Sequence, residues 1–247
     1  MSHEPHNDAA LLKNTIPEFL DEASSLIIQL EKYSADDLSH LMKVSKKLAV
    51  LNYDRLSNWD KNHNVQNSIH AALSFVGEAY RGLDARSLNV DALQYSQKTL
   101  RILSGLYGVL KPLDIIQAYR LEMGTGIKFN GQKSLCEFWK EKITRSLHKA
   151  VKQSPGDKIL INLASKEYSS AINFGTLNCK VVNVSFYEEK NGTPRMVTVY
   201  AKKARGLFAR FIIVNKIQNA DDLKAFESEG YYFDSRSSSE LDLVFKR

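Results

Sequence analysis

A continuous apolar stretch, Lys158-Ile-Leu-Ile-Asn-Leu-Ala164, is the feature that most restricts the fold. A strand with one solvated face alternates apolar and polar residues, so an unbroken apolar run is typical of a strand that is buried on both faces. Helices must then cover the sheet that contains it. The stretch therefore predicts a mixed α/β protein.

The rest of the last third also has the pattern of strands, with one helix among them. Asn191-Gly192 is a strong signal for a tight hairpin turn between strands at Val181–Tyr187 and Met196–Ala201. Tyr231–Asp234 and Leu241–Phe245 are predicted to form a closing pair of strands. We expect a mixed sheet built from the C-terminal third.

The first two thirds are predicted to be mainly helical, because capping residues precede apolar residues at helical spacing. The predicted helix starts are Thr15-Ile-Pro-Glu18, Ser34-Ala-Asp-Asp37, Tyr53, Asn89 or Asp91 (a helix that ends at Gly105), and Ser134-Leu-Cys-Glu137. No linker divides the chain. We expect a mobile tail at residues 1–14 and one domain at residues 15–247, with these helices covering the sheet.

The positive charge of the chain is concentrated in one segment. The 247 residues include 34 Lys and Arg against 28 Asp and Glu. Residues 191–220 contain six basic and no acidic residues, so the remainder of the chain balances to zero. The basic residues of this segment are Arg195, Lys202, Lys203, Arg205, Arg210 and Lys216.

On a helical wheel the basic residues between Lys202 and Lys216 fall in one arc of roughly 160°, opposite apolar residues. This pattern predicts a helix whose apolar face packs on the sheet while its basic face points outward. A solvated amphipathic face explains the pattern as well as a polyanion site does. Phosphates, a nucleotide or nucleic acid would all suit the second interpretation.

A second candidate site is Leu103-Ser-Gly-Leu-Tyr-Gly-Val-Leu-Lys-Pro112. Gly105 and Gly108 with Lys111 resemble the hairpin of a helix-hairpin-helix, whose backbone N–H groups bind a DNA phosphate. The alternative is a helix C-cap at Gly105 followed by a turn at Gly108. The bend at Lys43–Asn52 is a related possibility, with lysines but no glycine.

Several classes of protein and site are excluded or disfavoured. Cys136 and Cys179 lie far apart, and no His or Cys pair has metal-ligand spacing, so we expect neither a disulfide scaffold nor a metal site. No phosphate-binding loop, dinucleotide fingerprint or nucleophile elbow is present, and we expect no cofactor. No secretory signal or membrane span is predicted, which favours a soluble cytoplasmic protein.

Five segments together resemble the YaaA peroxide stress family. They are Leu100–Asp114, Tyr119-Arg-Leu-Glu-Met-Gly124, Ile161–Ser165 with Glu167-Tyr168, Tyr200–Leu207 continued by Arg210–Ile213, and Ser228–Asp234. The resemblance implies a cytoplasmic protein that helps cells survive hydrogen peroxide by lowering unincorporated iron. It also implies binding of duplex DNA through a basic cleft, and a mixed α/β fold with a helix-hairpin-helix-like element.

The resemblance supplies no established catalytic residues, so we expect a DNA-binding protein rather than an enzyme. The candidate phosphate-binding residues are Lys202, Lys203, Arg205, Arg210, Lys216, Gly105, Gly108, Lys111 and Arg120. The sequence departs from the family at its start, because members usually begin with a short apolar strand and a Ser-Pro-Ala-Lys-Thr stretch. If that strand joins the sheet in the family, this chain should have an exposed sheet edge.

Two alternatives remain open. One is an enzyme that acts on nucleotides or damaged DNA, with Lys202 or Lys203 as nucleophile or phosphate clamp and Glu167 or Tyr168 in acid–base roles. The other is direct sequestration of iron, which the lack of a His, Cys and carboxylate cluster disfavours.

Overall fold

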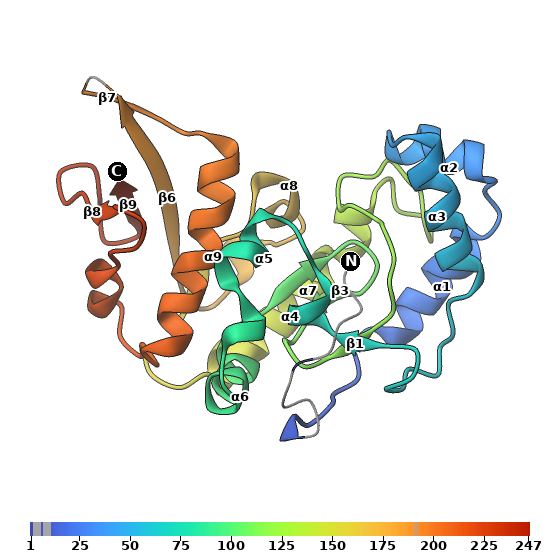
Figure 1. The fold of residues 1–247 in the computed structure, drawn as a ribbon, viewed down its shortest axis with the longest axis horizontal. Coiled ribbons are helices and arrows are strands. Elements are labelled where there is room, and N and C mark those ends of the chain that lie inside the picture. Colours follow the sequence, from blue (N-terminus) through green and yellow to red (C-terminus); the bar gives the residue numbers. More distant parts are fainter. Residues whose placement is uncertain (2–5, 7–10, 191) are drawn as a thin grey trace.

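The protein consists of a central body between two lobes (Figure 1). The structure, a computed structural model, describes Met1, His6 and residues 11–190 and 192–247. One lobe contains α1 (Leu20–Leu30), α2 (Ala35–Met42) and α3 (Lys46–Ser57). The other contains β6 (Lys180–Lys190), β7 (Thr193–Arg195), α9 (Thr198–Val214), β8 (Tyr232–Phe233) and β9 (Asp242–Lys246).

The central body joins the two lobes and contains the longest helix of the described residues, α7 (Leu135–Gln153). Its other elements are β1 (Ile69–His70), α4 (Ala71–Ser74), α5 (Glu78–Leu83), α6 (Val90–Thr99), β2 (Ile102–Ser104), β3 (Gly108–Leu110), β4 (Ile115–Ile116) and α8 (Lys166–Ser169). β5 (Ile159–Asn162) joins the central body to the sheet of the second lobe, where it pairs with β6. Short 3-10 turns lie at Ala85–Ser87, Phe174–Thr176 and Asp221–Ala225.

The main sheet has the strand order β5-β6-β9-β8, with β7 paired to β6. β5 and β9 run parallel to β6, whereas β7 and β8 form antiparallel pairs with their neighbours. The sheet is therefore mixed and comes from the last third of the chain, which confirms the predicted fold class. β5 lies at its edge, and among the described residues β5 pairs only with β6.

Two apolar cores stabilise the molecule. The larger core extends through the α1–α3 lobe and the central body and includes the fully buried Trp139 and Tyr107. The smaller core lies between α9 and the sheet, where Phe186 contacts the rings of Phe208, Phe226 and Phe245. α9 therefore packs on the sheet through its apolar face, as its sequence pattern predicts.

The predicted starts of three helices are confirmed, because a polar side chain caps each of them. Ser34 and Asp37 form a reciprocal capping box at α2, Asn89 accepts from the Ala92 N–H at α6, and Ser134 accepts from the Glu137 N–H at α7. The predicted box at Thr15 is wrong. The Thr15 hydroxyl donates to Asp114 at 2.6 Å instead, and α1 begins at Leu20 without a side-chain cap.

Three other element boundaries differ from prediction. The helix predicted to start at Tyr53 begins at Lys46, as α3. The hairpin predicted at Asn191-Gly192 is confirmed in its described residues by the pairing of Lys190 with Thr193, while Asn191 lies outside the described part. Its second strand is β7, and residues 198–201 form the first turn of α9. The helix predicted to end at Gly105 stops at Thr99, and residues 102–110 form the antiparallel β2–β3 hairpin. A helix-hairpin-helix in Leu103–Pro112 is therefore wrong, because its flanking segments are strands.

The described residues of the expected tail contact the body. His6 Nε2 lies 2.9 Å from the Leu88 carbonyl oxygen, Leu12 is in the larger core, and the Asn14 side chain hydrogen-bonds His70. Residues 2–5 and 7–10 lie outside the described part. Within the described residues, no helix is long and apolar enough to cross a bilayer.

Candidate nucleic-acid interface

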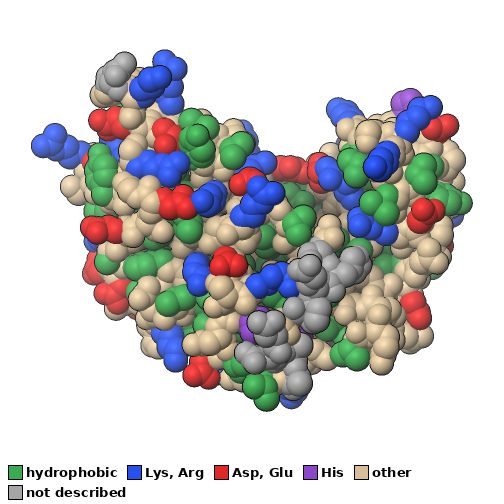
Figure 2. Space-filling view, in the orientation of Figure 1, with side chains coloured by type: hydrophobic (Ala, Val, Ile, Leu, Met, Phe, Trp, Pro, Cys, Tyr) green, Lys and Arg blue, Asp and Glu red, His purple; other side chains and the backbone are tan. Residues whose placement is uncertain are grey.

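The molecule is hollowed between its two lobes, and Lys and Arg side chains lie on both flanks of the hollow (Figure 2). A cavity of about 890 Å³ lies between α5 and α9 on one side and β5 with the end of α7 on the other. We call the hollow the cleft, and the cavity beside α5 and α9 the inner cavity. Five residues that line the inner cavity are basic: Lys98, Arg101, Arg120, Lys202 and Arg205.

Two glycines allow α5 and α9 to form one flank of the cleft. A Cβ on Gly206 would lie 1.8 Å from the Ala79 carbonyl oxygen, and one on Gly82 would lie 2.1 Å from the Lys203 carbonyl oxygen. Any side chain at either position would collide with the backbone of the other helix. The close crossing therefore requires glycine at both positions, and it fixes which face of α9 points into the inner cavity.

Only part of the predicted basic face of α9 reaches this cavity. Lys202 and Arg205 line it, whereas Lys203 points away and forms an ion pair with Glu229. Arg210 donates to the carbonyl oxygens of Leu83 and Asp84 at 3.1 and 2.9 Å, and so caps the end of α5. Successive residues of an α-helix are separated by about 100° around its axis, so the adjacent Lys202 and Lys203 point to different surroundings, which a count of charges does not reveal.

Lys216 lies beyond the end of α9, where its backbone has a φ of 50°. It lines a smaller depression with Arg210, Asn89 and Asp91, away from the inner cavity. Of the five α9-region residues predicted to bind phosphate, the structure brings Lys202 and Arg205 together in the inner cavity and places Lys203, Arg210 and Lys216 elsewhere.

Arg120 is held at the junction of the cleft and the α1–α3 lobe by a buried amide. The Asn52 side chain on α3 accepts from the Arg120 N–H at 2.7 Å and donates to its carbonyl oxygen at 3.0 Å. Asn52 is 1% exposed, so these bonds are shielded from water. The Arg120 guanidinium is exposed and pairs with Glu122 at 2.5 Å.

The two glycines of the β2–β3 hairpin do not reach the cleft. Gly105 and Gly108 are buried; the Gly105 carbonyl oxygen accepts from Trp139 Nε1, and a Cβ on Gly108 would lie 2.6 Å from the Trp139 ring. A Cβ on Gly105 would lie 2.3 Å from the Leu121 carbonyl oxygen, so packing explains both glycines without a phosphate. Lys111 follows the hairpin, where its N–H donates to Asp114, and it does not line the inner cavity.

The opposite flank contains a hairpin of two helices that the sequence marked only weakly. α2 and α3 are joined by Lys43, Val44 and Ser45, and Lys43 adopts the left-handed conformation with φ 52°. Glycine usually occupies such a position, so its absence hid the turn. Lys43, Lys46 and Lys47 are exposed here, and the Ser45 side chain caps α3.

Acidic and phenolic groups lie near the rim of the inner cavity. Glu167 accepts from the Gly124 N–H at 2.9 Å, next to Tyr168 and Glu122. Burial, together with the nearby charge of Glu167, raises the pKa of Tyr168 to about 12. Tyr168 therefore keeps its proton at neutral pH and can donate a hydrogen bond, which removes it as a general base.

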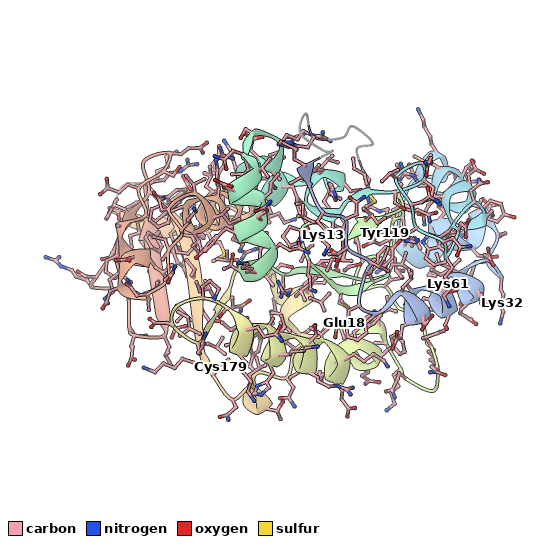
Figure 3. All side chains as sticks on the ribbon, turned by 90° about the horizontal axis from the view of Figure 1, so that it is seen from below. Lys13, Glu18, Lys32, Lys61, Tyr119 and Cys179 are labelled. Atoms are coloured by element: carbon pink, nitrogen blue, oxygen red, sulfur yellow. The ribbon has the colours of Figure 1, made fainter. Side chains whose placement is uncertain are left out.

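Tyr119 lies near the middle of the molecule (Figure 3), where its hydroxyl forms a 2.5 Å hydrogen bond with Ser104.

The sequence did not predict two of the basic residues that line the inner cavity, Lys98 and Arg101. Arg101 lies within the Leu100–Asp114 segment and Lys98 just before it, but the helix predicted to end at Gly105 gave no reason to place either residue at a site. In the described part of the chain, no group of three His, Cys, Asp or Glu side chains could hold a metal ion.

Comparison with known proteins identifies the family of the chain. The model of the family described as peroxide stress protein YaaA matches residues 2–237. A relative from Marinomonas sp. (strain MWYL1), named UPF0246 protein Mmwyl1_3597, is 46% identical over 233 residues, which cover 94% of this chain and 88% of the relative. A match over nearly the whole chain at this identity is decisive, and the chain belongs to the YaaA family of peroxide stress proteins.

Proposed function

We propose that this protein acts in the cytoplasm during peroxide stress by binding duplex DNA in its cleft, without sequence specificity. The observation that carries the proposal is the presence of basic side chains on both flanks of one hollow (Figure 2). Lys202, Arg205 and Arg120 belong to one flank or its base, and Lys43, Lys46 and Lys47 belong to the other. Opposed basic flanks suit the two phosphate backbones of a duplex.

The α2–α3 hairpin is the part we assign as the helix-hairpin-helix-like element. Its exposed turn precedes the N-terminus of α3, where Ser45 accepts from the Leu48 N–H. The N–H groups that precede Leu48 in this first turn have no partner within the helix and could bind an anion. Lys46 and Lys47 in the first turn of α3 add positive charge next to these N–H groups. Together they would contact one phosphate group without reading a base, so the expected recognition is of shape and charge.

We further propose that bound DNA is protected from oxidative damage and that the protein helps to lower unincorporated iron. No described residue is assigned to the iron effect. One observation favours the alternative of an enzyme that acts on nucleotides or damaged DNA: Lys202, Glu167 and Tyr168 line the same cavity. Lys203 cannot share that role, since it pairs with Glu229 on the other side of α9.

The proposal is tested by a salt-dependent titration of the protein with duplex DNA, single-stranded DNA and RNA. Binding that neutralises three to six phosphates predicts a slope of log affinity against log salt of about −3 to −5 for the duplex. Affinities for unrelated duplex sequences should agree within a few fold. No duplex binding at low salt, or a slope near zero, would refute the proposal.

A further inference from the structure

The inner cavity is lined by both aromatic rings and cationic side chains. Its volume of about 890 Å³ falls within the range of small-molecule sites. Leu103, Leu147, Ile161 and Ile213 make much of the lining apolar, while the rim near the cleft is polar. A ligand that fills it must therefore have an apolar or aromatic part and a charged part.

The aromatic part of the lining is a group of stacked rings. Phe75 and Tyr80 stack with their centroids 4.9 Å apart and an angle of 25° between the planes. Tyr119 meets the edge of Phe75 at 6.3 Å, and all three rings line the cavity with Tyr168. Flat aromatic faces at a cavity surface favour a flat ligand, because stacking then adds to the burial of apolar area.

The charged part of the lining is Arg205. Among the described residues its guanidinium has no hydrogen bond or ion pair, whereas Lys203 and Arg210 on the same helix have acidic partners, Glu229 and Asp84. Burial without a counter-charge lowers the pKa of Arg205. A half-buried cation that no carboxylate neutralises is costly unless an anion binds beside it.

Lys202 lines the cavity one helical turn from Arg205, and it too has no ion pair within the described part of the chain. Arg120 lies at the rim but is partly neutralised by Glu122. The anion is therefore expected between Lys202 and Arg205. Glu167 and Asn162, which also line the cavity, offer oxygen atoms that can accept from amino groups of a ligand.

We propose that the inner cavity binds a nucleotide, with its base against the rings of Phe75 and Tyr80 and its phosphate on Arg205 and Lys202. Two sources share this chemistry. One is a free nucleotide. The other is a nucleotide turned out of a duplex that lies in the cleft, and this second source rests on the proposed DNA binding.

Titration of the full-length protein with deoxyadenosine monophosphate tests the first source. Deoxyadenosine and deoxyribose 5-phosphate serve as probes that lack the phosphate or the base. Binding of the nucleotide at least tenfold tighter than of either fragment is expected, with a tenfold loss in Arg205→Gln and none in Lys203→Gln. Thermal unfolding of each variant shows whether it is folded. If Arg205→Gln is not folded, Arg205→Lys replaces it as a variant that keeps the positive charge but changes its hydrogen-bonding geometry.

A second arm compares a fully paired duplex with one that contains a single unpaired adenine. If the protein prefers the duplex with the unpaired adenine, loses this preference in Arg205→Gln and does not bind the free nucleotide, then DNA is the source of the ligand. If neither the free nucleotide nor the unpaired base is preferred, the nucleotide site is wrong even where duplex binding keeps its steep salt dependence. If duplex binding fails while the free nucleotide binds, the proposed function alone is wrong.

Discussion

The two flanks of the cleft reach a similar basic surface by different means. On the α9 flank the cations project from a helix that packs backbone to backbone against α5, and two of its basic side chains, Lys203 and Arg210, are used in structural contacts. On the α2–α3 flank Lys43, Lys46 and Lys47 are exposed beside a short turn, and within the described residues only Lys46 of these three forms an ion pair, with Asp36 at 3.7 Å. Local charge density in a sequence therefore overstates what is available for binding when the helix is closely packed.

The largest expected effect comes from breaking the close packing of the α9 flank. Gly206→Ala should lower the free energy of unfolding by about 3 kcal/mol, because the new methyl group would collide with the Ala79 backbone. Chemical denaturation measures the change. The matched control is Gly126→Ala, whose added Cβ would meet nothing within 4 Å. Equal stabilities of the two variants would show that the helices can separate at little cost.

The next effect concerns the attachment of the other flank. Asn52→Leu leaves the buried N–H and carbonyl of Arg120 without partners, and should lower the free energy of unfolding by about 2 kcal/mol. Duplex affinity should fall as well, because Arg120 loses its fixed position. Asn58→Leu is a suitable control, since Asn58 is exposed at the end of α3. Unchanged stability of Asn52→Leu would contradict the role assigned to this amide.

Removing charge from the α2–α3 flank should act on binding and not on folding. Lys46→Gln with Lys47→Gln is expected to make the salt slope of duplex binding shallower by about 2, because two phosphate contacts are lost. The control pair is Lys32→Gln with Lys61→Gln, which lie at the outer end of the same lobe (Figure 3). If both pairs change the slope equally, this flank acts only through its net charge.

The smallest expected effect concerns His63, which connects the α2–α3 flank to the central body. His63 Nε2 lies 3.0 Å from the Tyr107 hydroxyl and Nδ1 lies 3.1 Å from the Gln117 amide nitrogen, while burial lowers the pKa of His63. A histidine with a lowered folded-state pKa binds its proton more readily when unfolded. Stability should therefore fall as the pH drops below about 6.5, by at most about 1.4 kcal/mol per pH unit.

Chemical denaturation at pH 7.5 and 5.5 checks this dependence. The His63→Gln variant should lose less stability than the natural sequence over the same interval, since glutamine does not titrate. Parallel losses in the two proteins would assign the pH dependence to other groups, such as the buried His70.

Local patterns predicted much of this fold, and long-range packing explains where they failed. Ser34, Asn89 and Ser134 marked helix starts because capping depends on residues three positions apart. Gly105 and Gly108 misled the prediction because the groups that leave no room for a side chain there, the Leu121 backbone and the Trp139 ring, lie much farther along the chain. The α2–α3 turn was underrated because Lys43, not glycine, adopts the left-handed conformation.

The sequence predicted several residues of the candidate site but not which of them the fold brings together. Lys202, Arg205 and Arg120 were identified and line the inner cavity. Lys203 was grouped with Lys202 because a basic arc of roughly 160° is wider than the face that the α5 crossing leaves open. The position of α5 determines which basic residues of α9 can reach the inner cavity, and the sequence of α9 alone does not show where α5 packs.

Adjacent lysines on α9 provide the most direct test of the central claim, that the fold and not the charge count selects the DNA-binding residues. Lys202→Gln and Lys203→Gln remove the same charge from neighbouring positions, one lining the inner cavity and one paired with Glu229. Salt-dependent duplex titration of both variants should give a slope shallower by about 1 for Lys202→Gln and an unchanged slope for Lys203→Gln. Equal slopes for the two variants, or a larger change for Lys203→Gln, would contradict the account.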